Sequence, residues 1–238
     1  MKSYLTFDIG TTSVKLCLFD RDMRLTDHVA VEYPLKTHGN YVEADPAIYR
    51  DAILQGIRKL GDLSHVHAIC ATTQGETMIP VDDQGTPLSD AIVWLDSRAN
   101  EQAACLSQHF DDQYFYEQTG IPEISGALPL AKLLWLKECQ PTIFAKTKKL
   151  LLLEDYILYW LTGQFVTEKS LQCSSGWFNL HTDNYWTEAL EAVGVNRDLF
   201  PKLLECGTVI GQILPETAEE LGLSPKTLAI TGAMDQVA

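Results

Sequence analysis

The chain has 238 residues, of which 46% are hydrophobic and 21% are charged, and its formal net charge at pH 7 is -14. This hydrophobic content supports a folded core, in one large domain or two small ones, and excludes a disordered chain. The acidic balance argues against nucleic acid and anionic membranes as partners.

The first predicted elements are two strands, residues 4–7 and 14–19, joined by a polar turn. Both runs are rich in β-branched and aromatic residues, which favour strands. A carboxylate ends the first strand, and a glycine and three hydroxyl residues follow: Asp8, Gly10, Thr11, Thr12 and Ser13. Hydroxyls and turn N–H groups suit a phosphate, and Asp8 would hold a divalent cation against it. Lys15 lies two residues into the next strand. The alternative to a phosphate site is an ordinary hairpin whose turn is rich in threonine.

A third strand, residues 24–32, completes an antiparallel meander. A helix then begins at Asp45-Pro46, with the aspartate as N-cap and the proline at the first helical position. Its apolar residues recur at helical spacing as far as residue 60, and Gly61 ends it. Three further strands are predicted at residues 66–72, 77–81 and 91–94.

From Ser97, the predicted cap of the next helix, the pattern becomes mostly helical. Helices are expected at residues 97–109, 112–118, 128–139, 154–161 and 185–193, with a strand at 149–153. Two strands return at residues 209–213 and 228–231, on either side of a helix at 215–221. This order predicts an α/β fold with a mixed sheet, on which residues 97–204 form a largely helical insertion.

The strand at residues 66–72 is followed by Gln74, Gly75 and Glu76, at a strand end where α/β folds place ligands. The amide of Gln74 and the carboxylate of Glu76 would bind the hydroxyl groups of a polyol. A polar turn between two strands is an equally good interpretation of these residues.

The strand at residues 91–94 ends in a set typical of sugar sites: Trp94, Asp96 and Arg98. An indole face packs on sugar C–H groups, and charged side chains bond to hydroxyls. The alternative is that Ser97 caps a helix and that Asp96 and Arg98 form a surface ion pair.

The last strand runs into Gly232 and Asp235, which echo the glycine and aspartate after the first strand. Alone, this echo is a weak signal. The sequence contains no GxxxxGK[ST] phosphate loop and no GxSxG nucleophile elbow, and its histidines are dispersed.

The six cysteines are scattered and form no CxxC motif. They indicate buried, reduced thiols of a cytoplasmic protein. The N-terminus shows a strand pattern and no apolar signal region. The most apolar stretch, residues 150–161, is interrupted by Glu154 and Asp155 and is too short to span a bilayer, so no membrane contact is expected.

Five segments resemble the FGGY family of carbohydrate kinases, in the family's order across nearly the whole chain: DIGTTSVK, YVEADP, AIVWLDSRA, PLAKLLWLKE and GAMDQVA. The resemblance implies an actin and hexokinase-type (ribonuclease H-like) fold of two lobes with the substrate between them. Residues 1–238 would be the N-terminal lobe, with its core at about 1–96 and 205–238 around the insertion at about 97–204. The C-terminal, adenine-binding lobe would be missing, so this lobe alone is expected to be inactive.

The resemblance also implies ATP and Mg²⁺ as cofactors. The turn at residues 8–12 would face the phosphates and Mg²⁺, with Ser13 and Lys15 in the same cofactor-binding set. Gly232 would lie near the γ-phosphate, and Asp235 would be the base for the sugar hydroxyl. The expected partner is a small sugar or polyol, and a homodimer remains open.

The substrate is harder to predict, because the chain departs from the family's patterns. Glycerol kinases carry Arg-Glu where this chain has Gly75-Glu76, and a tyrosine where it has Ala127, five residues before the signature Lys132. Xylulokinases usually show Met-His-Gly near Gln74, where this chain has Gly-Glu-Thr, but WLDSRA resembles the xylulokinase pattern. We predict a pentulose such as xylulose, with glycerol or another polyol as an alternative. A non-catalytic sugar or nucleotide sensor on the same fold is the rival interpretation, and a base at Asp235 argues against it.

Overall fold

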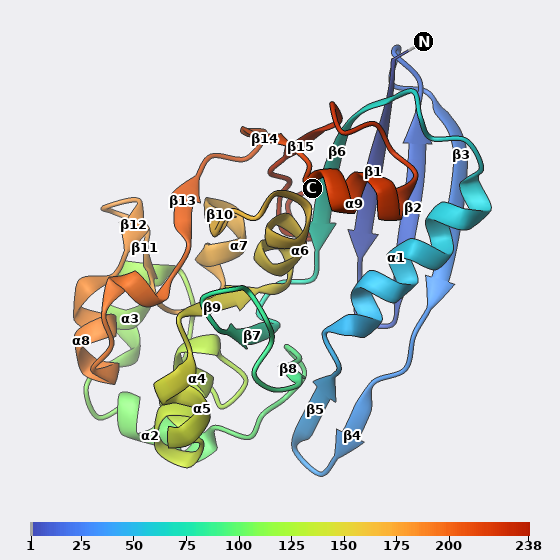
Figure 1. The fold of residues 1–238 in the computed structure, drawn as a ribbon. Coiled ribbons are helices and arrows are strands. Elements are labelled where there is room, and N and C mark those ends of the chain that lie inside the picture. The colour runs from blue at the N-terminus through green and yellow to red at the C-terminus, as the bar shows by residue number, and fades with distance from the viewer. Residues whose placement is uncertain (1) are drawn as a thin grey trace.

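The computed structural model describes residues 2–238, which form two sheets with helices packed around them (Figure 1). The larger sheet has six strands in the order β14-β15-β6-β1-β2-β3. Their bounds are β1 Ser3–Ile9, β2 Ser13–Phe19, β3 Leu25–Glu32, β6 Val66–Thr73, β14 Val209–Gln212 and β15 Leu228–Ile230. Strands β1, β6 and β15 run parallel, whereas β2, β3 and β14 run antiparallel to their neighbours, so the sheet is mixed.

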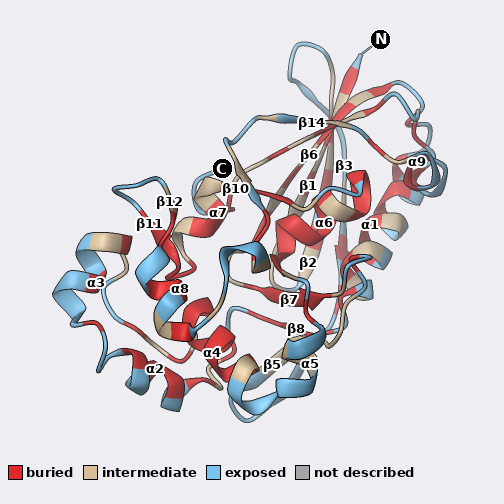
Figure 2. Ribbon diagram, turned by 60° about the vertical axis from the view of Figure 1, so that its left-hand side comes forward, coloured by how far each residue is buried: buried red, intermediate tan, exposed pale blue. Residues whose placement is uncertain are grey.

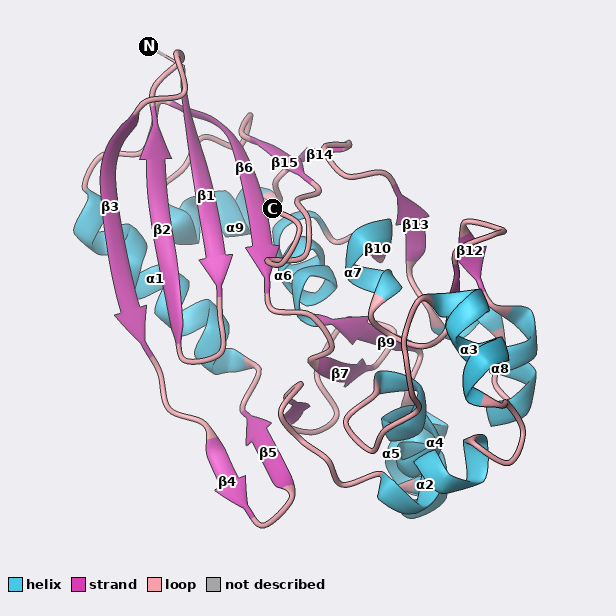
Figure 3. Ribbon diagram, turned by 180° about the vertical axis from the view of Figure 1, so that it is seen from behind, coloured by secondary structure: helices cyan, strands magenta, loops and turns pink. Residues whose placement is uncertain are grey.

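Three helices cover one face of this sheet: α1 Ala47–Leu60, α6 Leu153–Thr162 and α9 Pro215–Leu221. Figure 3 shows them behind the strands, whose other face points to the viewer. Alternate residues of β1, among them Leu5 and Phe7, are almost completely buried in this first core. Helix α1 approaches β2 closely at Gly56, where a Cβ atom would lie 2.3 Å from Leu16.

The smaller sheet has five strands in the order β4-β5-β8-β7-β9. Their bounds are β4 Lys36–His38, β5 Tyr41–Ala44, β7 Met78–Val81, β8 Ala91–Ile92 and β9 Lys149–Leu152. A second core lies beneath it, around the helices α2 Asn100–Leu106, α3 Asp112–Thr119, α4 Pro129–Cys139 and α8 Thr187–Val193. Figure 2 shows α4 largely buried, whereas α5 Pro141–Lys146 is exposed on the outside.

Short elements complete the part of the chain between α6 and β14. They are β10 Val166–Glu168, α7 Lys169–Cys173, β11 Phe178–Asn179, β12 Asn184–Tyr185, the 3-10 helix η1 Arg197–Leu199 and β13 Lys202–Leu204. Strand β10 pairs with β13 in parallel, and β11 pairs with β12. Helix α6 lies within residues 97–204 yet packs on β6 of the large sheet. The division of the chain into core and insertion stays a prediction.

Several local predictions are wrong. Ser97 does not cap a helix, because α2 begins only at Asn100, after Ala99. Pro46, not Asp45, is the N-cap of α1, although the Asp45 carboxylate accepts a hydrogen bond from the N–H of Ala47 at 2.9 Å. All six cysteines are free thiols, but none is fully buried and three are exposed. No helix among residues 2–238 has the length and apolarity needed to cross a membrane.

Candidate active site

The parallel strands β1, β6 and β15 end at the same edge of the large sheet, and the loops after them meet there. Asp8 on β1 pairs with Thr72 on β6, and Thr73 forms a parallel bridge with Met234. A pocket of about 90 Å³ opens between these loops. Its lining residues are Thr11, Gln74, Gly75, Glu76, Trp94, Met234, Asp235 and Gln236.

Gln74 lies at the base of this pocket and is only 3% exposed. Its N–H group is fixed by the carbonyl oxygen of Ile9 at 2.9 Å. Neither side-chain amide atom has a well-formed hydrogen bond within residues 2–238, although the Tyr49 hydroxyl neighbours it. A buried amide without partners is costly, so a ligand with hydroxyl groups would find both a donor and an acceptor here.

Glu76 has a left-handed backbone conformation, with φ of 65°. Such a conformation is unfavourable for a side chain larger than glycine and is found at functional sites. Burial raises the pKa of Glu76, while Lys132 and a hydrogen bond from Ser174 oppose that shift. The side chain is half-buried on the pocket wall, where it can accept hydrogen bonds from a ligand.

Trp94 also forms part of the pocket wall and is 39% exposed. Its indole N–H donates to the Thr11 hydroxyl at 3.0 Å, which links this wall to the turn after β1. Beneath it, the buried Lys132 ammonium donates to the carbonyl oxygens of Val93 at 3.0 Å and Trp94 at 3.3 Å. Burial lowers the pKa of Lys132 to about 8, although Asp96 and Glu76 oppose the shift.

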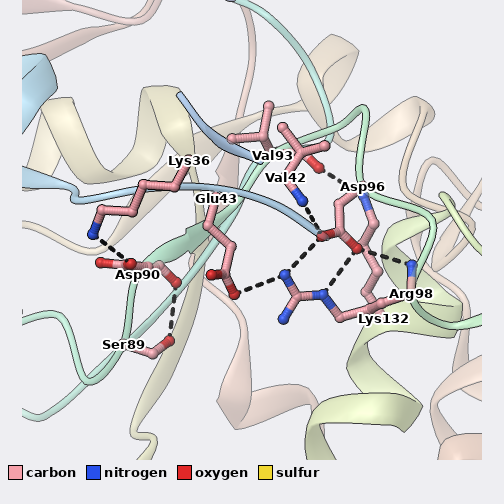
Figure 4. A network of polar contacts seen from close by, with 9 residues as sticks. All are labelled: Lys36, Val42, Glu43, Ser89, Asp90, Val93, Asp96, Arg98 and Lys132. Carbon is pink, nitrogen blue, oxygen red and sulfur yellow. Dashed lines mark hydrogen bonds and ion pairs between the residues drawn. The ribbon is translucent and has the colours of Figure 1, made fainter. Parts of the chain in front are cut away.

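Asp96 and Arg98 do not line the pocket, and Figure 4 shows them in a polar network of their own. The Arg98 Nη2 atom lies 2.7 Å from both Asp96 Oδ2 and Glu43 Oε1. The guanidinium also packs against two aromatic rings that contact each other edge to face, 4.0 Å from the centre of Tyr41 and 4.7 Å from that of Trp135. Asp96 is completely buried, so the alternative of a surface pair is wrong. The network ties the Trp94 loop to β5, and direct sugar contact by these two residues stays a prediction.

The turn after β1 carries the predicted cofactor set. Asp8 Oδ2 accepts a hydrogen bond from Lys15 Nζ at 2.9 Å across the hairpin, which raises the pKa of Lys15. The turn closes through the Gly10 N–H, which donates to the Ser13 carbonyl at 3.0 Å, and Thr12 is exposed at its tip. Residues 2–238 contain no cluster of three His, Cys, Asp or Glu side chains that could hold a metal. One carboxylate beside hydroxyls still fits Mg²⁺, which is commonly bound by one or two carboxylates and substrate phosphates.

Asp235 stands at the mouth of the pocket with its carboxylate exposed. Its N–H donates to the Thr73 carbonyl at 3.0 Å. Partial burial and repulsion from Asp8 raise the pKa of Asp235. Gly232, three residues earlier, passes so close to β6 that a Cβ atom would lie 1.7 Å from the Ala71 carbonyl oxygen. The glycine is therefore required by packing, whether or not a phosphate also binds there.

Sequence reasoning grouped most of these residues correctly in space but assigned Lys132 no role. It also missed the buried Glu154 and Glu168 and the half-buried Ser170, whose hydrogen bonds reach the backbone of residues 232–235 directly or through one another.

Known proteins of one family resemble this chain in sequence and in structure. Residues 3–238 match the model of the FGGY family of carbohydrate kinases, N-terminal domain. The chain is 29% identical to the gluconokinase of Bacillus subtilis over 242 residues, covering 100% of the chain and 47% of that protein. It is also 29% identical to the xylulose kinase of Bacillus subtilis over 243 residues, covering 99% and 48%. The structure of gluconate kinase from Lactobacillus acidophilus superposes with a TM-score of 0.91 at 29% identity, over 98% of this chain and 48% of that one.

The chain thus spans about half the length of the curated relatives it matches. The predicted fold class is confirmed: the mixed sheet with packed helices is the actin and hexokinase-type fold of these kinases. The family model matches residues 3–238, and the similar sugar kinases match the chain over the same length. The chain belongs to the FGGY family of carbohydrate kinases.

Proposed function

We propose that the protein containing this chain transfers a phosphoryl group from ATP to a hydroxyl of a small sugar or polyol, with Asp235 as general base. The observation that carries the proposal is the meeting of Asp235 with Gln74, Glu76 and Trp94 at one pocket. This pocket lies at the carboxyl ends of three parallel strands, where open α/β sheets bind ligands.

Each group has a role that suits its surroundings. The exposed Asp235 carboxylate takes the proton of the attacking hydroxyl, and its raised pKa makes it a better base than an ordinary aspartate. The turn at residues 10–13, with Lys15 and Gly232, would bind the phosphates. Asp8 would hold Mg²⁺, which when bound neutralises charge on the transferred group. Gln74, Glu76 and Trp94 would orient the sugar.

The charges around the pocket favour a neutral sugar over a sugar acid. Two carboxylates, Glu76 and Asp235, line it, and no cation of residues 2–238 does. The nearby cations are engaged elsewhere, Arg98 with carboxylates and Lys132 with carbonyl oxygens. A pentulose such as xylulose therefore fits this half of the site better than gluconate, which would bring a third carboxylate.

A sugar or nucleotide sensor on the same fold is the second candidate. A sensor needs no base, whereas Asp235 places an exposed carboxylate beside a row of sugar-binding side chains. We therefore favour the kinase.

A substrate screen tests the proposal. ADP release by the complete protein is measured with xylulose, other pentuloses, hexuloses, glycerol and gluconate, alongside Asp235→Asn. We expect the highest kcat/KM with a neutral pentulose and strong loss of turnover in the variant. No ADP release with any substrate would contradict the kinase, and a clear preference for gluconate would contradict the neutral substrate.

A further inference from the structure

The segment Gly232-Ala233-Met234-Asp235, here called the Asp235 loop, is held by hydrogen bonds from two sides. On one side lies β6. The Thr72 hydroxyl donates to the carbonyl oxygen of Ala233 at 2.7 Å, and the Asp235 N–H donates to the Thr73 carbonyl at 3.0 Å. These bonds come from the sheet itself and explain how the loop follows the strand end.

The other side of the Asp235 loop is held by side chains from α6 and α7. The Gly232 N–H donates to Glu154 Oε1 at 2.9 Å, and the Met234 N–H donates to the Ser170 hydroxyl at 3.1 Å. Ser170 in turn donates its own proton to Glu168 Oε1 at 2.8 Å. Because the serine proton is used by Glu168, the serine oxygen is oriented to accept from Met234.

These acids are unusual in their burial. Glu154 and Glu168 are both 0% exposed. Glu154 Oε2 has no hydrogen-bond partner within residues 2–238. Burial, with added repulsion from Glu168, raises the pKa of Glu154 well above its ordinary range. Buried acids without a cation partner cost stability, and well-packed apolar side chains are often more stable in their place. What these two acids contribute to the Asp235 loop is geometry. Glu154 accepts directly from the Gly232 N–H, whereas Glu168, which also caps α7, orients the Ser170 hydroxyl that accepts from Met234.

We propose that Glu154 and Ser170 are positioning residues for Asp235, and that Glu168 orients Ser170. The N–H groups of Gly232 and Met234 are fixed by hydrogen bonds to side chains of α6 and α7, and β6 binds the rest of the loop. Together these contacts fix the position of the Asp235 carboxylate at the pocket. The inference rests on the proposed function, because it needs Asp235 to act as the base. Loss of the hydrogen bond between the loop and Glu154 or Ser170 would displace the Asp235 carboxylate. It would leave the proposed sugar-binding residues Gln74, Glu76 and Trp94 in place.

The test compares matched variants in the complete protein. Ser170→Ala removes the acceptor for Met234, and its control is Ser175→Ala. Ser175 lies in the same segment and is fully buried, whereas Ser170 is half-buried. Ser175 also accepts a hydrogen bond from a backbone N–H, that of Trp177 at 3.2 Å, away from the Asp235 loop. Glu154→Met removes the acceptor for Gly232, and Glu154→Gln retains an oxygen that can accept. The readouts are kcat, sugar KM, melting temperature and amide hydrogen exchange across the Asp235 loop.

We expect Ser170→Ala and Glu154→Met to lower kcat roughly 10- to 100-fold, as displaced catalytic groups do, with little change in sugar KM. Their Asp235-loop amides should exchange faster. Glu154→Gln should restore kcat and the slower amide exchange. Ser175→Ala should lower the melting temperature at least as much as Ser170→Ala, because Ser175 is more buried, while keeping kcat. Equal loss of kcat in both serine variants, or a Glu154→Gln variant as impaired as Glu154→Met, would overturn the inference.

Asp235→Asn, measured in parallel, separates this inference from the proposed function. Normal kcat in Asp235→Asn would show that Asp235 is not the base, and the positioning role would be contradicted with it. Strong loss in Asp235→Asn together with normal kcat in Ser170→Ala and Glu154→Met would leave the base in place and overturn the positioning alone. Unchanged hydrogen exchange of the Asp235-loop amides in Ser170→Ala and Glu154→Met would also overturn the positioning role. It would show that these two contacts do not stabilise the loop.

Discussion

The backbone N–H of Asp235 donates to the carbonyl oxygen of Thr73 at 3.0 Å. Thr73 is the last residue of β6, directly before Gln74. This one bond joins the loop that carries the proposed base to the loop that carries Gln74 and Glu76, the proposed sugar-binding side chains, so the two loops share one support.

Glu76→Ala should raise the KM for the sugar and leave the KM for ATP nearly unchanged, because Glu76 lines the pocket and not the turn after β1. Loss of a hydrogen bond to a charged group costs about 1.5–3 kcal/mol, so the rise should be roughly tenfold or more. Steady-state kinetics of the complete protein measure both constants. Glu191→Ala, an exposed glutamate on α8, is the control. Equal shifts in the two KM values would show that Glu76 is structural.

Two lysines of α4 provide a matched pair for the Trp94 wall. Lys132 donates to the carbonyls of Val93 and Trp94, and Lys137 donates to those of Val193 and Gly194. Either change to Met should destabilise the fold by about 1–3 kcal/mol, because carbonyl partners are lost. Only Lys132→Met should also raise the sugar KM, since only Lys132 supports the pocket. Urea unfolding and kinetics check this, and a sugar KM that rises equally in Lys137→Met would contradict it.

Asp155 predicts a pH dependence of stability. Its burial raises the pKa to about 8 in the folded chain, far above its ordinary value of 3.8. The unfolded chain releases this proton at low pH while the folded chain keeps it. The free energy of unfolding should therefore fall as pH rises from about 5 to 8, by at most ~1.4 kcal/mol per unit for one group. Glu154, whose pKa is also raised, acts in the same direction.

The matched variant for this dependence is Asp155→Asn. Its amide oxygen can still accept from the Leu152 N–H, which bonds to Asp155 Oδ2 at 2.9 Å. Urea unfolding of the chain at pH 5, 6, 7 and 8 should show a shallower decline in the variant than in the natural protein. An unchanged slope would mean that Asp155 does not titrate as its burial indicates.

Residues 1–238 expressed alone should fold but show no kinase turnover. The relatives they match are about twice as long, so the proposed activity would need the rest of the protein. Circular dichroism would report folding, and coupled ADP release would report activity. Turnover close to that of the complete protein would contradict the need for a second lobe.

The large sheet could be predicted because its elements have long, regular patterns. Seven residues alternate in β1, and fourteen residues of α1 repeat their apolar positions at helical spacing. Strands β10 and β13 contain three residues each, and their existence depends on parallel pairing between segments that lie far apart in the chain. No local pattern could show them.

The sequence predicts the place of a polar residue at the edge of the large sheet where that residue lies at or after a strand end, as for Asp8, Gln74 and Asp235. The contacts of the Arg98 side chain could not be predicted, because its partners Glu43, Tyr41 and Trp135 come from other segments. Glu154 was noticed only as a charge that interrupts an apolar stretch. An acid in an apolar helix was itself the signal of a buried polar contact, but its partner, the Gly232 N–H, lies far along the chain.

The central claim is that Asp235 is the base of a sugar kinase, and Asp235→Asn tests it most directly. The change keeps the size of the side chain and removes the base. We predict that kcat of the complete protein falls by ~10²–10⁴ while sugar binding, measured by calorimetry, survives. Asp8→Asn, as the companion variant, should instead weaken the use of Mg·ATP and shift the Mg²⁺ dependence. An Asp235→Asn enzyme with near-normal kcat would contradict the assignment and remove the main argument for a kinase over a sensor.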